Sequence, residues 1–327
     1  MHMNEAAITV KKKFDISNFL LSYGFYILFV VMFIVCGIIS PYFLTRDNLM
    51  QIMWGATTLL VVAAGGTFVI VTGNMDMSVG SVALCSSAIA VYAMNHGAGF
   101  AQMVILIFVV GAVIGAVNGI LVTYCKLNSM LATLGMMILL RGIALNITNG
   151  GAQTSLPPEF KMIADSRIGG ISVLILVSLI ILLVFQCVLR KTRFGAYCYA
   201  IGCSEESAKR IGLPLKRVKM AVYILSGICA AFVGFVACSK VGTYSGTIGN
   251  EMEFDVVTVC VMGGTSLLGG RGNIFPGTFI GVVLLYLINN ILALTGASPY
   301  IYPFAKGLVI FAAMYVDALK NFRKKRI

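Results

Sequence analysis

Charged side chains are scarce in this chain, and that shortage determines the solvent in which it can fold. Only 11% of the 327 residues are Asp, Glu, Lys or Arg, whereas 59% are hydrophobic, and the mean hydropathy is +0.96. These values lie far outside the usual composition of soluble globular domains. Uncharged runs that approach the ~20 residues needed to cross ~30 Å of hydrocarbon occur at 20–39, 52–72, 103–124, 171–189 and 220–237. The composition therefore predicts an integral membrane protein and excludes one held by a single anchor.

Residues that bind metals or nucleotides are also scarce. The two histidines, His2 and His96, lie far apart, and the nine cysteines are scattered through apolar stretches without a Cys-x-x-Cys pair. We expect the cysteines to be small buried apolar side chains, and we expect no metal site. No Gly-x-x-x-x-Gly-Lys-Ser/Thr motif occurs, so the chain is not expected to hydrolyse ATP itself. The sequence thus predicts no catalytic residue and no cofactor bound by this chain.

Basic residues gather at three places, and their distribution bears on topology rather than on nucleic-acid binding. Much of the net charge of +12 comes from lysines before the first apolar run, from bases in and around residues 190–219 and from bases at the end. Short loops rich in Lys and Arg stay in the cytoplasm. The sequence therefore predicts a single transmembrane domain, 1–327, with a cytoplasmic N-terminal segment 1–19, a cytoplasmic loop 190–219 and a basic cytoplasmic tail 318–327.

About ten helical crossings fit that topology, so the predicted fold class is an all-α polytopic membrane protein. The expected helices cover 20–39, 51–72, 78–96, 102–124, 129–147, 171–189, 219–239, 256–268, 275–295 and 300–317. The runs 78–96 and 256–268 either cross fully or are re-entrant. The similar stretches GAVIGAV (111–117) and GTFIGVV (277–283) fit a 5+5 inverted repeat. A chance match between two glycine-rich helices explains them equally well.

A short polar run, GCSEESAKRIGLP (202–214), interrupts the apolar sequence. A serine can cap its first turn, two acids and then two bases match the helix dipole, and Gly212 and Pro214 can end the helix after about two turns. The run is either a solvated loop helix or a docking element for a cytosolic partner. Its candidate docking residues are Ser204, Glu205, Glu206, Ala208, Lys209, Arg210 and Gly212.

Polar side chains also occur at the ends of apolar runs and within them. In VTGNMDMSVGS (71–81), Asp76 is either the N-cap of the next helix or a functional intramembrane carboxylate. Arg141 either snorkels to an interface or pairs with a carboxylate. Buried amides and hydroxyls could line a path for an uncharged polyhydroxyl solute, or each could join two helices by a hydrogen bond. The candidate pathway residues are Asp76, Ser78, Asn118, Asp255, Thr258 and Asn289.

Several stretches, in order over nearly the whole chain, carry a resemblance to a known family. They are GNMDMSVGS (73–81), SMLATLGMMILLRG (129–142), TRFGAYCYAIGCSEESAKRIGL (192–213), EFDVVTVCVMGGTSLLGGRGNIFPGT (253–278) and the basic tail. Together they look like the membrane permease subunit of bacterial ABC importers for sugars, the ribose, galactose and xylose group. The same permease type is similar to those that serve autoinducer-2 and other small polar solutes. The chain departs from the family pattern at Asn74 and Met77 and near Ser129 and Met130.

The resemblance implies a division of labour between several proteins. Two permease chains, expected to be identical, would form the pathway in the bacterial cytoplasmic (inner) membrane, with ribose as the foremost solute. A cytosolic ABC ATPase would bind ATP-Mg and the helix 204–212, and an extracytoplasmic sugar-binding protein would deliver the solute. Closure of the ATPase would move the rigid helix and, through it, the spans. Asp76, Ser78 and Asp255 would border the pathway.

Two functions of other classes stay open on the sequence alone. An ion-driven carrier would take up solute without an ATPase, although no span contains the ladder of carboxylates or histidines that a proton relay uses. A membrane-embedded enzyme could use Asp76 and Asp255 as an acid and base pair.

Overall fold

The protein is predominantly helical in the computed structural model, which describes residues 16–150, 154–298 and 300–324. The predicted segment 1–19 begins, and the predicted tail 318–327 ends, outside these ranges. The helices are α1 (Ile16–Ile39), α2 (Arg46–Val71), α3 (Val79–Asn95), α4 (Phe100–Thr123), α5 (Ser129–Ile147), α6 (Pro158–Asp165), α7 (Val173–Lys191), α8 (Arg193–Cys203), α9 (Glu205–Arg210), α10 (Leu215–Val241), α11 (Met252–Met262), the π-helix η1 (Ile274–Thr278), α12 (Phe279–Leu294) and α13 (Ile301–Lys324). Each run expected to form a membrane helix therefore overlaps one of these helices.

The strands and one helix of the fold differ from the sequence-based expectation, and the short helices α6 and α8 were not predicted. Two pairs of antiparallel two-residue strands occur, β1 (Thr154–Ser155) with β4 (Thr243–Tyr244) and β2 (Arg167–Ile168) with β3 (Ile171–Ser172), so the all-α prediction misses them. The helix expected at 256–268 has the wrong bounds, because α11 ends at Met262 and the glycine-rich stretch after it turns back as a loop. Left-handed backbone at Gly264, Gly269 and Gly270 explains why the helix cannot continue there.

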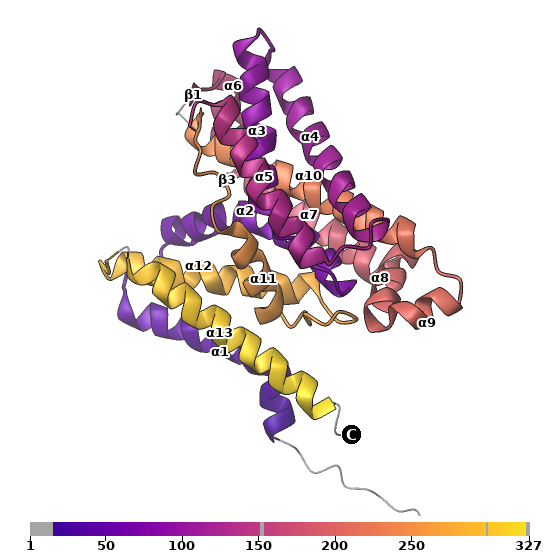
Figure 1. The fold of residues 1–327 in the computed structure, drawn as a ribbon. Helices are drawn as coiled ribbons and strands as arrows, with labels where there is room; N and C mark the ends of the chain where they lie inside the picture. Colours follow the sequence, from indigo (N-terminus) through magenta and orange to yellow (C-terminus); the bar gives the residue numbers. More distant parts are fainter. Residues whose placement is uncertain (1–15, 151–153, 299, 325–327) are drawn as a thin grey trace, which may run out of the picture.

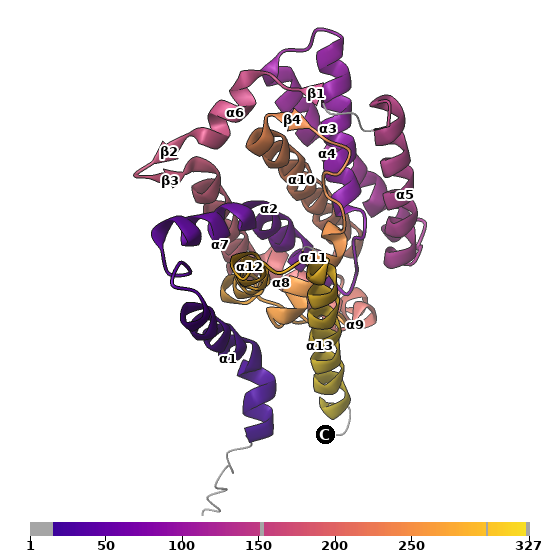
Figure 2. The same cartoon turned by 90° about the vertical axis from the view of Figure 1, so that its left-hand side faces the viewer.

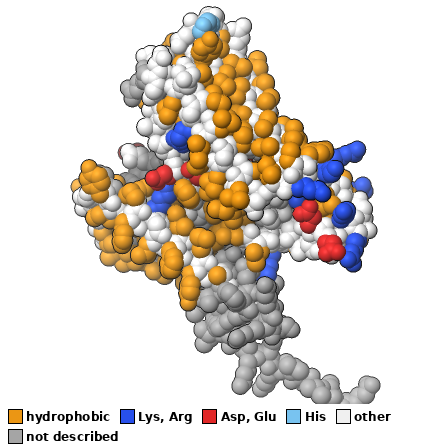
Figure 3. All heavy atoms as spheres, in the orientation of Figure 1, with side chains coloured by type: hydrophobic (Ala, Val, Ile, Leu, Met, Phe, Trp, Pro, Cys, Tyr) orange, Lys and Arg blue, Asp and Glu red, His pale blue; other side chains and the backbone are white. Residues whose placement is uncertain are grey.

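The described helices match a membrane environment. By length and composition, six segments can cross a membrane, namely α2, α4, α5, α7, α10 and residues 274–294. Shorter apolar helices cover residues 24–39, 79–95 and 301–312. Large apolar side chains such as Ile38, Ile138 and Phe311 are exposed. Figure 3 shows how such side chains cover wide areas over α4, α5 and α13, which is typical of a surface that meets lipid.

Helix α2 lies at the centre of the molecule. Every residue from 56 to 71 is buried, and α2 packs against α7, α10, α11 and α12. Figures 1 and 2 show α3, α4 and α5 on one side of α2, and α1 and α13 on the other. A helix that is apolar all around is expected to be enclosed by others, so α2 can pass a displacement at one of its ends to most of the bundle.

Helices α4 and α10 approach each other closely through glycine. A Cβ atom at Gly115 would lie 2.4 Å from the carbonyl oxygen of Tyr223, and one at Gly227 would lie 2.2 Å from that of Gly111. Small residues at this spacing let helix backbones touch in a membrane. The second glycine stretch behaves in the same way, because a Cβ atom at Gly281 would lie 2.2 Å from the carbonyl oxygen of Val259.

Most cysteines are buried, as the sequence predicted. The buried ones are Cys36, Cys85, Cys198, Cys229, Cys238 and Cys260, whereas Cys125, Cys187 and Cys203 are exposed. All of them are free thiols.

Candidate functional site

The short helix α9 has the ends that its sequence predicts. The Ser204 hydroxyl accepts a hydrogen bond from the Ser207 amide at 3.2 Å, and Gly212 adopts the left-handed conformation with φ of 77°. These two observations confirm the N-cap and the glycine at the C-terminal end. Pro214 does not end α9, because α9 already ends at Arg210 and Pro214 is instead the residue before α10.

One face of α9 is fixed to the bundle and the other faces outward. The Glu205 carboxylate forms an ion pair with Lys219 of α10 at 2.7 Å, and Ala208 is only 2% exposed. On the opposite side Glu206 and Arg210 pair with each other at 2.6 Å while both side chains remain 77% exposed. Figure 3 shows this charged end of the molecule, which contrasts with the apolar sides. Helix α9 is thus a charged projection attached to α10.

The sequence did not predict α8, which connects α9 to the rest of the bundle. Thr192 caps α8, and the buried side chains of Cys198 and Ile201 fix its inner face. Burial raises the pKa of the Tyr199 phenol, against the opposite effect of the nearby Arg190. The phenol therefore stays protonated and donates a hydrogen bond to the carbonyl oxygen of Gly272 at 2.8 Å.

The glycine-rich loop after α11 brings α8 and the end of α2 together. The amide of Gly270 donates to the carbonyl oxygen of Val71, the last residue of α2, at 2.9 Å. A Cβ atom at Gly202 of α8 would lie 1.8 Å from that same oxygen. The loop glycines therefore permit close approach, as expected from the sequence. A displacement of α8 would therefore also displace the end of α2 and the loop.

A buried polar network surrounds Asp76, at the break between α2 and α3. One carboxylate oxygen accepts hydrogen bonds from the Ser78 amide at 3.0 Å and the Ser78 hydroxyl at 2.6 Å. The other oxygen accepts from the Ser226 hydroxyl of α10 at 2.7 Å. Asn118 of α4 donates to Ser78 at 2.8 Å, while its own amide oxygen has no partner within the described part of the chain. Asp76 therefore supports the start of α3 and also joins that start to α10.

The Asp76 carboxylate is stabilised by hydroxyl and amide donors rather than by a cation. Its residue is 8% exposed, and no ion pair involves it among the described residues. A buried carboxylate needs such donors because each charged hydrogen bond contributes about 1.5–3 kcal/mol. The sequence pointed to Asp76, Ser78 and Asn118 but missed Ser226, because a serine within a long, largely apolar helix is a weak signal.

A second polar cluster joins α11 to α13. Lys306 of α13 pairs with Asp255 at 2.9 Å and with Glu251 at 3.2 Å, and its side chain is only 10% exposed. Glu251 adopts left-handed backbone with φ of 59°, and Glu253 is 5% exposed. The sequence analysis missed Lys306. Its position inside the apolar stretch of α13 could have revealed the pairing, because a charge at such a place needs a partner.

The remaining candidate pathway residues do not join either cluster. The Thr258 hydroxyl donates to the carbonyl oxygen of Phe254 within α11 at 2.6 Å, and Asn289 is half-buried on α12. The structure thus brings Asp76, Ser78 and Asn118 into contact and places Asp255 and Thr258 together on α11.

Two other polar residues connect neighbouring segments. Arg141 hydrogen-bonds the side chain of Asn250, just before α11, and no ion pair involves it among the described residues. Asn290 and Asn48 exchange two amide hydrogen bonds, at 2.7 and 3.0 Å, between α12 and α2. The interpretation of such amides as joints between helices holds for Asn290.

Comparison with known proteins identifies relatives over most of the chain. Residues 48–316 match the family model described as the permease component of the branched-chain amino acid transport system. The chain is 32% identical to the ribose import permease protein RbsC of Haemophilus influenzae over 95% of its own length and 97% of that protein. It is 34% identical to RbsC of Bacillus subtilis, over 96% of the chain and 98% of that protein. It is also 32% identical to the autoinducer 2 import system permease protein LsrC of Yersinia pestis, over 88% and 82%.

Proposed function

The chain belongs to the family of the permease component of branched-chain amino acid transport systems, and on that premise we propose that it is the membrane permease of an ATP-driven sugar importer. Its relatives include ribose import permeases matched over almost their full length, and we propose ribose as the solute. The observation that carries the proposal is α9, a charged helix exposed on one face and fixed to the bundle on the other.

In the proposed mechanism, the chain transmits work and performs no chemistry. A separate ABC ATPase binds ATP-Mg on the cytoplasmic side and receives α9 through Glu206, Lys209 and Arg210. Movement of α9 passes to α10 through the pair of Glu205 with Lys219, and through α8 to the end of α2. A rigid attachment is required here because a flexible one would absorb the displacement.

We further propose the topology and assembly that the sequence indicated. The ten predicted crossings place both termini and α9 in the cytoplasm of a bacterial cell, with the protein in the inner membrane. Two copies form the pathway, and a sugar-binding protein docks on the outer face. The packing of α4 against α3 and α10 has its counterpart in the packing of α12 against α11 and α2, which supports a 5+5 inverted repeat.

In this proposal the pathway passes between the two polar clusters. Asp76, Ser78 and Asn118 would border it in the first half of the chain, and Asp255, Thr258 and Asn289 would border it in the second. Both clusters lie at short or broken helices, which in transporters are the elements that line binding sites.

Autoinducer-2 is the second candidate solute, because the chain is also 32% identical to the Yersinia pestis LsrC protein. Uptake measured in cells that carry the permease, its ATPase and its binding protein distinguishes the two. Ribose accumulation that excess autoinducer-2 does not reduce supports the ribose proposal, and the reverse result replaces it.

The coupling role of α9 has a test with a matched control. Glu206 and Glu159 are both exposed acids in the first turn of a short helix, but Glu159 belongs to α6. We expect Glu206→Lys to reduce the amount of ATPase copurified with the permease by about tenfold, which corresponds to one lost charge-assisted contact. Glu159→Lys should leave it unchanged. If both variants copurify the same amount of ATPase, α9 is not the docking element.

A further inference from the structure

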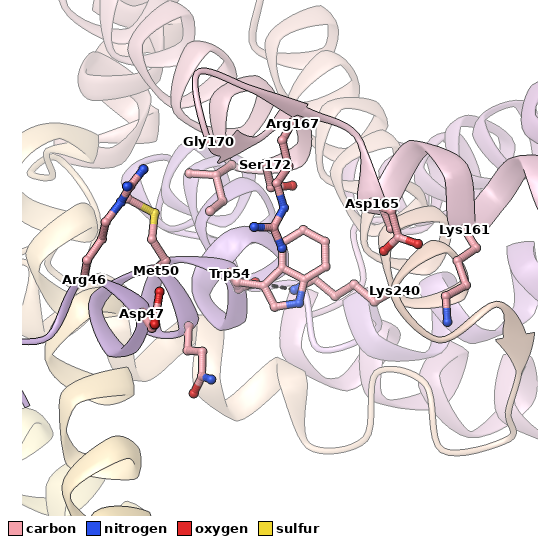
Figure 4. Close-up of a pocket in the computed structure, with 13 residues that line it drawn as sticks. Arg46, Asp47, Met50, Trp54, Lys161, Asp165, Arg167, Gly170, Ser172 and Lys240 are labelled. Atoms are coloured by element: carbon pink, nitrogen blue, oxygen red, sulfur yellow. Dashed lines mark hydrogen bonds between the residues drawn. The ribbon is translucent and has the colours of Figure 1, made fainter. Parts of the chain in front are cut away.

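A cavity of about 640 Å³ opens at the end of the bundle opposite to α9. It lies between the first turns of α2, the end of α6, the β2–β3 hairpin and the last turn of α10. The other end of α2 contacts α8, and the first turns of α10 hold α9. In the proposed topology the cavity is therefore on the outer face, where the solute would arrive. Figure 4 shows its lining, of which Arg46, Asp47, Trp54, Asp165, Arg167 and Lys240 carry the chemistry.

The charged side chains around the cavity are not used in ion pairs. No ion pair involves Arg46, Arg167, Asp47 or Asp165 among the described residues. All four side chains are exposed, and Figure 4 shows Arg167 directed from the hairpin toward the indole of Trp54. These groups can therefore exchange their water for a ligand without first breaking a salt bridge.

The combination of groups fits a neutral polyhydroxyl ligand better than an ion. A sugar hydroxyl is both a donor and an acceptor, so it can bind guanidinium groups and carboxylates at the same site. A cation would be repelled by the four bases Arg46, Lys161, Arg167 and Lys240, while the carboxylates of Asp47 and Asp165 offset in part the attraction of these bases for an anion. Trp54 adds a half-buried aromatic surface against which the apolar face of a sugar ring can pack. The volume is also within the range of ~300–1,000 Å³ typical of small-molecule sites.

Lys240 separates this cavity from a second one. It lines both, with its ammonium group 4.7 Å from the centre of the Trp54 ring and hydrogen-bonded to the backbone carbonyl of Trp54. The second cavity, of about 480 Å³, is lined in part by the hydroxyl-bearing Thr58, Thr247 and Tyr286. A solute that leaves the first cavity past Lys240 would therefore meet hydroxyl groups rather than hydrocarbon.

We propose that the cavity around Trp54 is a receiving site that holds the sugar after the binding protein releases it, with Asp165 and Arg167 as its hydrogen-bonding residues and Lys240 as its inner wall. The inference rests on the proposed function, because it takes the solute to be a sugar. It assigns the permease a solute site of its own, at the outer end and apart from both polar clusters.

The chain offers an unusually direct test, since Trp54 is its only tryptophan. We would titrate the purified permease in lipid nanodiscs, without the binding protein, with D-ribose and follow intrinsic fluorescence. The expected result is a saturable change with a dissociation constant in the millimolar range, as suits a site that must release its ligand. Sodium acetate at equal concentrations should give no saturable change. A Trp54→Phe variant should lose the signal.

Two variants of lining residues and one matched control test whether ribose binds in this cavity. Asp165→Asn and Arg167→Gln should each weaken ribose binding by about fivefold or more, because each removes a charged hydrogen-bonding group. Glu159→Gln removes an exposed charge from the same helix as Asp165 but does not line the cavity, so it should bind as the wild type does. All three side chains are exposed, so none of these changes should prevent folding.

Several results would overturn the inference. They are a flat fluorescence signal up to about 100 mM ribose, a response to acetate but not to ribose, and equal affinities in all variants. Ribose-stimulated ATP hydrolysis by the complete reconstituted complex is measured in parallel. If that stimulation is present while the permease alone gives no signal, the receiving site is wrong and the importer proposal stands. If ribose binds normally but never stimulates ATP hydrolysis, the importer proposal fails instead.

Discussion

The close contact between α4 and α10 makes a quantitative prediction for Gly115→Ala. The added Cβ atom would lie 2.4 Å from the backbone oxygen of Tyr223 and 3.0 Å from the Cα atom of Ile224. Ordinary van der Waals contact begins near 3.4 Å, so the helices would have to separate by about 1 Å. Backbone atoms cannot rotate away as a side chain can. Overpacking of this kind costs about 1–3 kcal/mol.

The same Gly→Ala substitution in α5 should stabilise the protein instead of destabilising it. Gly135 lies in α5, and nothing stands within 4 Å of the position its Cβ atom would occupy. Alanine there reduces the conformational entropy of the unfolded chain and is expected to stabilise by about 0.5–1 kcal/mol. Each variant adds one methyl group to the wild type, yet their free energies of unfolding should differ by about 1.5–4 kcal/mol.

The native cysteines supply the assay. Six of them are buried, including Cys229 and Cys238 of α10, so a thiol-reactive dye reports the loss of packing during a temperature ramp in detergent. Gly115→Ala should melt below the wild type and Gly135→Ala at or above it. If Gly115→Ala and Gly135→Ala have the same melting temperature, the backbones of α4 and α10 are not in close contact.

Three further variants probe the polar clusters and the end of α9. Lys306→Met should destabilise the protein by about 3 kcal/mol because it leaves Asp255 without its cation, and the added change Asp255→Asn should recover part of the loss in the same melting assay. Asp76→Ala should cost about 1–3 kcal/mol by leaving the Ser226 hydroxyl unpaired, whereas Asp76→Asn, which still accepts that bond, should melt closer to the wild type but transport more slowly in an uptake assay. Gly212→Ala should cost about 1–2 kcal/mol because of its left-handed backbone, and Gly212→Asn should cost less.

The parts of the site that depend on nearby residues could be predicted from the sequence. The N-cap at Ser204, the acids and bases of α9 and the left-handed Gly212 all follow from rules that act within one or two helical turns. The approximate positions of the membrane helices could likewise be predicted, because each contains a continuous apolar run. The helix α8 escaped because its mixture of tyrosine, cysteine and glycine, RFGAYCYAIGC, lacks a clear apolar periodicity.

The parts that depend on distant residues could not be predicted. Asp76 and Ser226 are separated by 150 positions, and the partners of Lys306 come from a different helix. A single sequence identifies a buried carboxylate as unusual but does not say which hydroxyl or amine meets it. The same limit applies to the outer cavity, whose lining comes from three separate stretches of the chain, 46–54, 161–175 and Lys240.

The distribution of rigid and less enclosed segments bears on how movement at α9 would open a pathway. The joint of α8, the glycine-rich loop and the end of α2 is made of backbone contacts that leave no room for a Cβ atom at Gly202. A displacement of α9 must therefore move α2 or the loop, because this joint cannot be compressed. The loop continues directly from α11, a helix of 11 residues whose main attachment to α13 is Lys306. A displacement of the loop therefore reaches α11 first, and α11 also packs against α2 and α12. We expect the proposed pathway to open beside α11, where the two ion pairs of Lys306 join it to α13.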